Sequence, residues 1–551
     1  MEGYKRLKDP IYGYIVIPDG YMNNIIDTSV FQRLRRIVQT SYAPLYSSAL
    51  HNRFVHSIGV YHLGEMAATR MEDELRTMRG LELGTDLTKI KEVFVLACLL
   101  HDVGHAPFSH TGEIFYLGDN MDYTALHSDL EACVQTISFK HDIPLERNHC
   151  AAPHEIMSVI VGIKEFSVYL SDEFSKEFFA RCITGYRYTE DTMLNQVLNC
   201  YISLLNSKVI DVDKLDYLIR DAYVTGFDTV NIDYQRLLES LTIIRNEEDA
   251  YELAYTKNAI SIVENVIYAH DAERKWIQNH PVVLYESFLL QHIFGELSNW
   301  IKNGVKLFSK EALGKEGVVI VDAIKDDDGK IIVGEERIRM LCDDDIIYLM
   351  KNKIDCELVD EYFERRYRRH PIWKSEAEYN ALFLDMSQGG SILDNYEKAM
   401  QATANYLSKS SNAWFIDDNL IEIIKHELDL LQGEDLEPRT KKIQERQKKD
   451  ILKVITCLQQ YASDIGMDND FILLMVSQFN SGFGKVDFAE TKIVFRNQTN
   501  EKVAKVGEIV SSVEARKQKR EKFFYLFYKR KEGVVIDKQE LCKRLYAEFL
   551  M

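Results

Sequence analysis

The sequence is poor in the residues that interrupt helices. Only 9 of its 551 residues are proline and 27 are glycine, and both counts are below average usage. Turn-rich all-β folds need more of both, so this composition argues against them and favours long helices. Hydrophobic residues make up 46% of the chain, which is ordinary for a globular protein and excludes the disordered and fibrous classes. We therefore expect a mostly α-helical protein.

Cysteines are few, and their spacing shows no pairing. The nine are scattered, odd in number and include no C-x-x-C pair, which argues against a disulfide framework and fits reduced thiols. No apolar run approaches the roughly 18–20 residues that span a bilayer. The first residues, MEGYKRLKDP, contain no apolar export signal. We therefore expect a cytoplasmic protein with no membrane partner.

Positive charge is in deficit. The chain has 67 Lys and Arg against 86 Asp and Glu, a formal net charge of −19, which argues against a general nucleic-acid coat protein. At roughly 100–200 residues per domain, the length predicts more than one domain. The clearest change in sequence pattern follows residue 310, where GVVIVDAI and KIIVG flank KDDDG as two strands would flank a turn. We expect a helical core over residues 1–310 and a C-terminal α+β lobe over 311–551 for assembly and regulation.

Histidine and aspartate residues from separate segments form the first candidate site. His56 falls on the apolar face of a helix expected from about residue 52. His101 and Asp102 end the apolar run VFVLACLL, where a buried carboxylate without a partner costs several kcal/mol. A cation removes that cost, and imidazole with carboxylate suits Mn, Fe, Ni, Zn or Mg. With Asp213 these residues predict a divalent metal site. For His56 taken alone, a hydrogen-bonded core histidine is the alternative.

The segment VIDVDKLDYLIRDA predicts a polar helix face beside that metal. Four of its side chains are spaced i, i+3, i+4 and i+7 and share one face: Asp213, Asp216, Tyr217 and Arg220. Lys214 lies one residue round. Part of this pattern is explained by a structural ion pair between Asp216 and Arg220. Ammonium, phenol and guanidinium groups beside a metal are what a phosphorylated substrate needs.

A third group combines imidazoles with carboxylates: His105, His110, Glu113, His154 and Glu155. Imidazolium groups can donate to phosphate oxygens or protonate a leaving oxygen, and a neighbouring carboxylate fixes the tautomer and tunes the pKa. These residues predict general acid and base catalysis next to the metal.

Four ordered motifs resemble the HD-domain deoxynucleoside triphosphate triphosphohydrolases: HNRFVHSIGVYHLGEMA, LLHDVGHAPFSHTGE, PHEIMSVI and IDVDKLDYLIRDA. The resemblance is to the branch that combines a SAM domain with an HD domain and to its bacterial relatives. It covers roughly residues 1–290, and no segment matches the SAM domain. It implies a helical phosphohydrolase core that converts dNTPs to deoxynucleoside and inorganic triphosphate. It also implies Mn, Fe, Zn, Ni or Co at the HD site and Mg on the substrate triphosphate.

The resemblance implies roles at the matching positions. The implied metal ligands are His56, His101, Asp102 and Asp213. The implied catalytic residues are His105, His110, Glu113, His154 and Glu155. The implied substrate-binding residues are Gln39, Arg53, Lys214, Tyr217 and Asp221. Of these, Gln39 and Asp221 would hold the 3′-hydroxyl of the deoxyribose, and Arg53, Lys214 and Tyr217 the phosphates.

The N-terminal segments YKRLKDPIYGYIVI and IIDTSVFQRLRRIVQT carry a second resemblance. They are similar to the family's segment that binds an activating guanine nucleotide at a subunit interface. The matching positions are Lys5, Asp27, Gln32 and Arg35. This implies a homo-oligomer, a tetramer or a dimer, activated by GTP, dGTP or a dNTP. A helix with a solvated polar face is the alternative.

Two positions depart from the family pattern. Thr40 stands where relatives have a leucine that packs on the sugar, and Ile277 stands near the expected tyrosine that helps to reject ribose. Rejection of a 2′-hydroxyl depends on filling that space, so the choice between deoxyribo- and ribonucleotides stays open. An HD phosphohydrolase acting on ribonucleotides or other nucleotides is therefore the alternative within enzymes.

Two further classes of function remain as alternatives. Nucleic-acid binding or cleavage is suggested by residues 515–533, where basic and aromatic side chains alternate. The same alternation is typical of a half-buried strand. The arginines of YFERRYRRHP could instead hold the phosphates of an allosteric nucleotide. A pure ligand sensor is disfavoured, because no ligand of the metal set is replaced.

Overall fold

The computed structural model describes these residues: 3–40, 45–78, 83, 85–117, 122–227, 231–301, 305–325, 331–409, 416, 418–433, 437–468, 470–477, 488–496, 501–510 and 522–550. Helices dominate them, which confirms the expected mostly α-helical class. Among these residues no helix is long and apolar enough to span a bilayer. Two segments considered in the sequence analysis, the turn at 326–330 and the basic residues 515–521, lie outside the described residues.

The chain forms two compact units, and each is discontinuous in sequence. The first comprises Met1–Ile277, Glu286–Val359 and Phe483–Gln518, and the second comprises Gln278–Tyr285, Asp360–Gly482 and Lys519–Met551. Residues 311–359 therefore belong to the same compact unit as the His and Asp motifs. A functional boundary near residue 310 stays a prediction.

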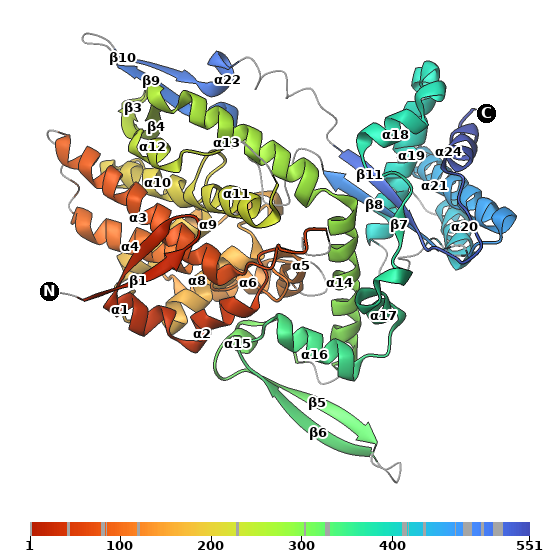
Figure 1. The fold of residues 1–551 in the computed structure, drawn as a ribbon, viewed down its shortest axis with the longest axis horizontal. Coiled ribbons are helices and arrows are strands. Elements are labelled where there is room, and N and C mark those ends of the chain that lie inside the picture. The colour runs from red at the N-terminus through yellow and green to blue at the C-terminus, as the bar shows by residue number, and fades with distance from the viewer. Residues whose placement is uncertain are drawn as a thin grey trace. The chain divides into compact units, whose positions relative to one another are not determined.

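The first unit is built mainly from helices (Figure 1). Its helices are α1 Asp19–Tyr21, α2 Ser29–Gln32, α3 Arg53–Thr77, α4 Leu87–Leu100, α5 His110–Glu113, α6 Thr124–Cys133, α7 Ile137–Asp142, α8 Pro153–Glu165, α9 Glu173–Thr184, α10 Met193–Leu205, α11 Val212–Thr225, α12 Tyr234–Glu239, α13 Ile260–Glu273, α15 Lys310–Leu313, α16 Asp343–Lys353 and α22 Val506–Ile509. Its strands are β1 Tyr4–Asp9, β2 Gly13–Pro18, β3 Leu241–Arg245, β4 Tyr251–Thr256, β5 Val318–Lys325, β6 Ile331–Ile338, β9 Lys492–Arg496 and β10 Glu501–Lys505. Helices α14 Pro281–Trp300 and α17 Glu357–Phe363 cross from one unit's residues to the other's.

Helices α3 and α4 form where local signals specify them. The Asn52 side chain caps α3 by accepting from the backbone N–H of Val55. The face that carries His56 is buried along the helix, as the spacing predicts. Helix α4 is apolar nearly all round and buried from residue 93 to 100. Because α3 packs against both α4 and α11, the ends of these three helices bring distant polar residues to one place.

Helix α8 packs closely on the end of α4, and two residues, Pro153 and Gly104, determine how. Pro153 is the first residue of α8, a position that suits proline because an N–H there would have no partner within the helix. A Cβ at Gly104 would lie 2.2 Å from the backbone nitrogen of Ser158 in α8. Only glycine therefore lets the loop after α4 pack this closely on α8. This contact places His105, in the loop after α4, beside His154 of α8.

Two expectations about secondary structure are wrong. The amphipathic pattern of residues 210–305 predicts continuous helices, but β3 and β4 pair in register and join β9 and β10 in a sheet of order β10-β9-β4-β3. The segment LTIIR is rich in β-branched residues, a strand signal that the flanking helices obscured. The His- and Asp-rich stretch 119–150 predicts irregular structure, but α6 and α7 form among its described residues. Leu126 and Leu130, one helical turn apart, are buried in α6, and Phe139 is buried in α7. The β5–β6 hairpin is as predicted.

The second unit contains a three-stranded sheet of order β7-β11-β8 and several helices. Its strands are β7 His370–Pro371, β8 Phe471–Ser477 and β11 Lys522–Tyr528, and its helices are α18 Glu376–Leu382, α19 Gly390–Lys409, α20 Asp418–Gly433, α21 Pro438–Ile465 and α24 Lys538–Ala547. The rings of Phe523, Phe524, Tyr525 and Phe527 are buried. They are therefore not exposed for stacking on nucleic-acid bases. Arg369 is also buried and ion-paired with Glu361.

Candidate metal centre and histidine pocket

Four predicted metal ligands converge at the ends of α3, α4 and α11. The Nε2 atom of His56 lies 3.0 Å from Asp213 Oδ1, 3.3 Å from His101 Nε2 and 3.6 Å from Asp102 Oδ2. His101 Nε2 lies 3.4 Å from Asp102 Oδ1 and 3.6 Å from Asp213 Oδ1. The side chains of His56, His101 and Asp102 are buried, whereas that of Asp213 is 37% exposed. Three of the four side chains are thus shielded from solvent, and solvent reaches the cluster at Asp213.

Hydrogen bonds behind the two imidazoles turn the same nitrogen of each toward the centre. The Nδ1 of His56 lies 2.7 Å from Asp216 Oδ2, and the Nδ1 of His101 lies 2.9 Å from the carbonyl oxygen of Cys98. Carboxylate and carbonyl oxygens only accept, so both Nδ1 atoms carry a proton and both Nε2 atoms are turned toward the cluster. This arrangement is the usual support of metal-binding histidines. The donor set therefore fits a divalent metal ion.

The carboxylates of this cluster stay ionised. Burial alone raises the pKa of Asp102, but the charge of Arg53, followed by His101 and His105, holds that pKa well below its usual value. Arg53 Nη1 donates to Asp102 Oδ2 at 2.8 Å with both groups buried. A buried negative charge next to two imidazoles is the environment that a cation stabilises.

Arg53 connects the metal centre to the neighbouring pocket. Besides Asp102, its guanidinium donates to Ser109 Oγ at 2.9 Å and to the carbonyl of Gln39 at 3.0 Å. Its Nη2 also lies 3.1 Å from His110 Nε2. Three oxygen acceptors therefore orient the planar guanidinium group of Arg53. Its Nη2 edge faces His110.

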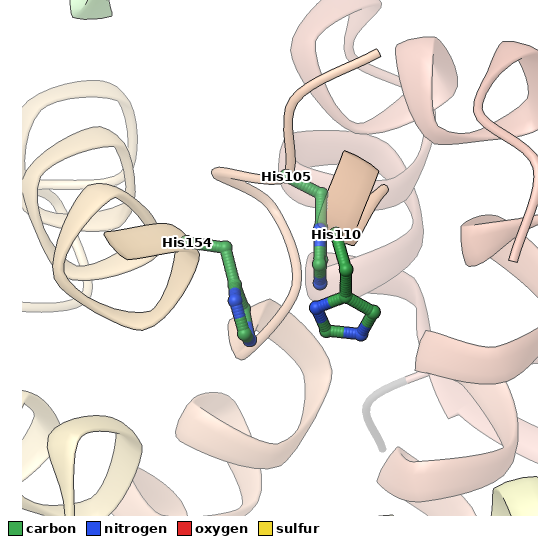
Figure 2. Close-up of side chains that lie close together, drawn as sticks. All are labelled: His105, His110 and His154. Carbon is green, nitrogen blue, oxygen red and sulfur yellow. The ribbon is translucent and has the colours of Figure 1, made fainter. Parts of the chain in front are cut away.

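The histidine pocket contains His105, His110 and His154 (Figure 2). The rings of His105 and His154 are stacked with centroids 4.0 Å apart, and His110 lies edge-on to both at 5.0 Å. Glu113 lies behind this pocket: its Oε1 is 3.3 Å from His110 Nδ1, and its Oε2 pairs with His154 Nδ1. His105 Nε2 lies 3.1 Å from Asp102 Oδ1, so the pocket adjoins the metal ligands.

The histidines of the pocket differ in how readily they take up a proton. Burial lowers the pKa of His110 to about 4 and holds the pKa of His105 well below its usual value. Burial also disfavours charge on His154, but the Glu113 carboxylate outweighs it and raises that pKa. The pocket therefore combines two imidazoles that resist protonation with one whose protonation the Glu113 carboxylate favours, and this combination suits proton transfer beside a phosphate.

Glu155 lies at the start of α8 and acts on the backbone. Its Oε2 accepts from the N–H of Ala152 at 2.6 Å, and its Oε1 accepts from Asn206 Nδ2 at 2.7 Å. Burial raises the pKa of Glu155 to about 7. The carboxyl group thus holds the first turn of α8, which carries His154.

The two residues implied for the sugar are connected through His51, which the sequence analysis did not single out. The backbone N–H of Gln39 donates to the carbonyl of His51 at 3.0 Å, and His51 Nε2 lies 2.7 Å from Asp221 Oδ1. Gln39 Oε1 is buried and has no hydrogen-bond partner among the described residues. The only sequence signal for His51 was its place at the start of the first motif.

The two residues of α11 implied for phosphate binding, Lys214 and Tyr217, have different surroundings. The ammonium group of Lys214 donates to the carbonyl of Ser207 at 2.9 Å and pairs with Asp211, which also caps α11. In this structure the Lys214 ammonium group is therefore bound by Asp211, the N-terminal cap of α11. Burial raises the pKa of Tyr217 well above its usual value, and the charge of Glu273 adds to the shift, so the phenol is a hydrogen-bond donor at neutral pH.

The four positions implied for an activating nucleotide lie as two neighbouring pairs. Lys5 Nζ is 3.7 Å from Asp27 Oδ2, and Arg35 Nε donates to Gln32 Oε1 at 2.9 Å. The Arg35 guanidinium also lies over the Phe54 ring, 3.5 Å from its centroid. Burial lowers the pKa of Arg35 and the charge of Asp27 opposes that shift, so the two pairs interact electrostatically.

Comparison with known families identifies the domain that carries these ligands. The HD domain family model matches residues 53–143. This chain contains an HD domain. The matched HD segment contains His56, His101 and Asp102.

Curated relatives of this HD-domain protein share about half of its length. A deoxynucleoside triphosphate triphosphohydrolase SAMHD1 homolog of Dictyostelium discoideum is 29% identical over 305 residues, covering 54% of this chain and 50% of that protein. The deoxynucleoside triphosphate triphosphohydrolase SAMHD1 of Danio rerio is 28% identical over 274 residues, covering 47% and 42%. An uncharacterized protein of Mycoplasma genitalium is 28% identical over 265 residues, covering 47% and 52%. The chain spans about half the length of the curated relatives it matches.

Solved structures share the fold across nearly the whole chain. A hypothetical protein from Aquifex aeolicus has a TM-score of 0.52 at 18% identity, covering 99% of this chain and 100% of that one. A phosphohydrolase from Bacteroides thetaiotaomicron has a TM-score of 0.53 at 18% identity, covering 96% and 100%. At this identity the likeness shows the fold alone.

Proposed function

We propose that this HD-domain protein hydrolyses deoxynucleoside triphosphates to deoxynucleoside and inorganic triphosphate, using a divalent metal and an activating nucleotide. The observation that carries the proposal is the position of Arg53, which bonds to Asp102 of the metal cluster and lies 3.1 Å from His110 of the histidine pocket. A triphosphate lying along this guanidinium would reach both groups at once. Two of the curated relatives are named for this activity.

A metal bound by His56, His101, Asp102 and Asp213 would polarise a phosphoryl oxygen and acidify a water molecule. The protein's own groups supply the remaining functions. The guanidinium of Arg53, fixed by Ser109 and the Gln39 carbonyl, neutralises phosphate charge. The Tyr217 phenol adds a donor.

The histidine pocket supplies the proton that the leaving 5′-oxygen requires. His154 holds a proton at Nδ1 against Glu113, and the same carboxylate contacts Nδ1 of the neutral His110. The carboxylate thus links a protonated imidazole to a neutral one that faces Arg53. His110 takes up at Nε2 the proton that the attacking water loses and passes it to the leaving 5′-oxygen, while the Glu113 carboxylate stabilises the imidazolium that forms in between. Gln39 and Asp221, linked by His51, hold the sugar hydroxyl.

The nucleotide activator belongs to the same proposal. Lys5 and Arg35 provide cations, and Asp27 and Gln32 provide acceptors, on neighbouring parts of the first unit. An ammonium with a guanidinium suits nucleotide phosphates, and a carboxylate suits the N–H groups of a guanine edge. In the family resemblance such a site lies between subunits, so the proposal includes a homo-oligomer.

Hydrolysis of ribonucleotides is the second candidate, and two residues favour it. Ile277 is fully buried and apolar where the family places a tyrosine near the sugar. The Thr40 hydroxyl is buried and has no hydrogen-bond partner among the described residues. A hydroxyl in place of a leucine side chain leaves room and a polar partner for a 2′-hydroxyl.

A product assay tests both candidates. Metal-depleted full-length protein is reconstituted with Mn, Mg, Fe or Co and incubated with each dNTP and NTP, with and without GTP or dGTP. We expect inorganic triphosphate and deoxynucleoside, with faster turnover in the presence of the guanine nucleotide. Pyrophosphate or phosphate as the first product would refute the proposed reaction, and equal turnover of NTPs would establish the second candidate.

Ligand variants show whether turnover depends on this centre. Asp102→Ala combined with Asp213→Ala should abolish hydrolysis while the helical circular dichroism spectrum is retained. Asp355→Ala, at an exposed carboxylate of the same unit, is the matched control and should keep full activity. Retained turnover in the double variant would place catalysis elsewhere.

A further inference from the structure

The N-terminal hairpin reaches the metal ligand His56 through a buried charge cluster. Asp216, on α11, accepts four hydrogen bonds from side chains of three segments. Its Oδ2 accepts from His56 Nδ1 at 2.7 Å and from Arg220 Nε at 2.9 Å. Its Oδ1 accepts from Arg220 Nη2 at 2.9 Å and from Tyr12 Oη at 2.8 Å. The carboxylate orientation is therefore set jointly by α11 and by the turn between β1 and β2.

The hairpin turn is itself fixed on this cluster by a second contact. Asp9 Oδ2 accepts from Arg220 Nη1 at 3.0 Å, and Asp9 Oδ1 accepts from the backbone N–H groups of Ile11 and Tyr12 at 2.8 and 3.0 Å. One carboxylate thus closes the turn and binds the guanidinium. Asp9 and Tyr12 form the end of the hairpin that faces the HD core.

This cluster has little freedom to rearrange. His56, Asp216, Arg220, Asp9 and Tyr12 are all buried, and partial loss of such a network leaves charges without partners. The cluster also lies directly against α3. A Cβ at Gly59, three residues after His56, would be 1.9 Å from Asp216 Oδ1. A shift of the carboxylate is therefore transmitted to the helix and to the imidazole.

The orientation of His56 matters to the metal because one Nδ1–H bond determines where Nε2 points. Groups behind metal ligands orient them and tune their affinity. Without the Tyr12 hydroxyl, Asp216 Oδ1 would keep only Arg220, and the carboxylate could rotate about that bidentate pair. Rotation would tilt the imidazole away from Asp102 and Asp213.

We propose that Asp9 and Tyr12 are positioning residues for the metal centre, so that the β1–β2 hairpin controls metal affinity through Asp216. The inference rests on the proposed metal centre and is independent of which nucleotide is hydrolysed. The same hairpin carries Lys5, on β1, at its outer surface. Anything that binds that surface and moves the hairpin changes metal affinity, and by linkage the metal changes the affinity of that surface.

The test is a Mn²⁺ titration of metal-depleted full-length protein, followed by electron paramagnetic resonance of free and bound Mn²⁺. Tyr12→Phe removes only the hydroxyl that holds Asp216. We expect it to weaken Mn²⁺ affinity about tenfold and to change the bound-Mn²⁺ spectrum. Turnover of Tyr12→Phe should be low at limiting Mn²⁺ and should recover at high Mn²⁺.

The hairpin offers a matched control. Tyr14 is 65% exposed, and its ring lies under Lys8 at 4.5 Å, a contact that phenylalanine keeps. Tyr14→Phe should bind Mn²⁺ like the parental protein. Asp9→Asn is the second variant, in case Tyr12→Phe does not fold, and it should also weaken Mn²⁺ binding.

The outcomes are separable. Unchanged Mn²⁺ affinity and spectrum in Tyr12→Phe, together with a lower thermal midpoint of the metal-free protein, would make Tyr12 a purely structural residue and overturn the inference. If the parental protein itself binds no Mn²⁺, nor any other divalent ion tested, the metal centre fails together with the inference. If Mn²⁺ binding depends on Tyr12 while no triphosphate is formed, the inference stands and the proposed reaction fails.

Discussion

The carboxylate of Asp343 accepts a hydrogen bond from the backbone N–H of Phe108 at 2.6 Å, although 235 positions separate the two residues. Its other oxygen accepts from the N–H of Val38 at 2.8 Å. Phe108 and Ser109 both have positive φ values, 55° and 54°, in a region that non-glycine residues rarely adopt. Asp343 therefore holds the strained loop between His105 and His110 and also the segment before Gln39. A residue from beyond position 310 therefore supports the part of the first unit that carries the candidate site.

Replacing Asp343 by asparagine should loosen both contacts. An amide offers one acceptor and would direct its NH₂ group at the second backbone N–H. Burial, opposed by the two backbone N–H groups, raises the pKa of Asp343 to about 7. Because this pKa is higher in the folded than in the unfolded chain, the stability it contributes is full below about pH 4 and is lost as the pH rises through 7. The stability advantage of the parental protein over Asp343→Asn should fall by on the order of 2 kcal/mol from pH 5 to pH 8.

Urea unfolding of the two proteins across this pH range measures that difference. Asp344→Asn, at an exposed carboxylate of the same helix end, is the matched control for the helix N-terminus. A difference between parental and Asp343→Asn that stays constant with pH would contradict the buried, titrating carboxyl group.

Gly59→Ala should destabilise the protein even though alanine is the better helix former. The new methyl would lie 1.9 Å from Asp216 Oδ1 and 2.5 Å from Arg220 Nη2. Overpacking of this kind costs about 1–3 kcal/mol, against a gain of about 1 kcal/mol in helix propensity. We expect a lower free energy of unfolding and weaker Mn²⁺ binding. Gly20→Ala, where the nearest atom is Tyr169 Oη at 3.5 Å, should be nearly neutral. Equal stability of the two variants would argue against the tight contact.

Glu113→Gln should slow turnover without removing the metal. The amide cannot sustain the charge on His154, so the proton held between these residues is lost. We expect kcat to fall by about 10²–10⁴-fold with parental Mn²⁺ content. Glu146→Gln, at a side chain that is 79% exposed next to His149, is the control. Parental kcat in Glu113→Gln would exclude the Glu113–His154 pair from catalysis.

Arg53→Lys should impair catalysis although the charge is retained. A lysine ammonium cannot bond at once to Asp102, Ser109 and the Gln39 carbonyl, because those acceptors match the planar fork. We expect kcat/KM to fall by about 10²-fold. Arg36→Lys, at a guanidinium that is 69% exposed, should behave like the parental protein. If Arg53→Lys also does so, charge alone suffices at this position.

Local sequence signals accounted for much of the fold and for the chemistry of the site. Low proline and glycine content, apolar spacing and caps predict the helices at His56 and before His101, and Pro153 marks the start of α8. The two strands around residues 318–338 were also predictable. These features depend on residues a few positions apart, which share a helix turn or a strand pair. The residue types of the metal set follow from the same local pattern.

The tertiary structure decided which distant residues support that site. The contacts of Tyr12 with Asp216 and of Asp343 with Phe108 join segments more than 200 positions apart, and no local spacing encodes them. The same holds for β4, whose strand pairs in parallel with β9 some 240 residues later, and for Lys214, which the helix cap at Asp211 holds. A periodic pattern specifies which face of an element is buried. The partner of that face depends on how the whole chain packs, because each buried polar group must find a partner within the folded core.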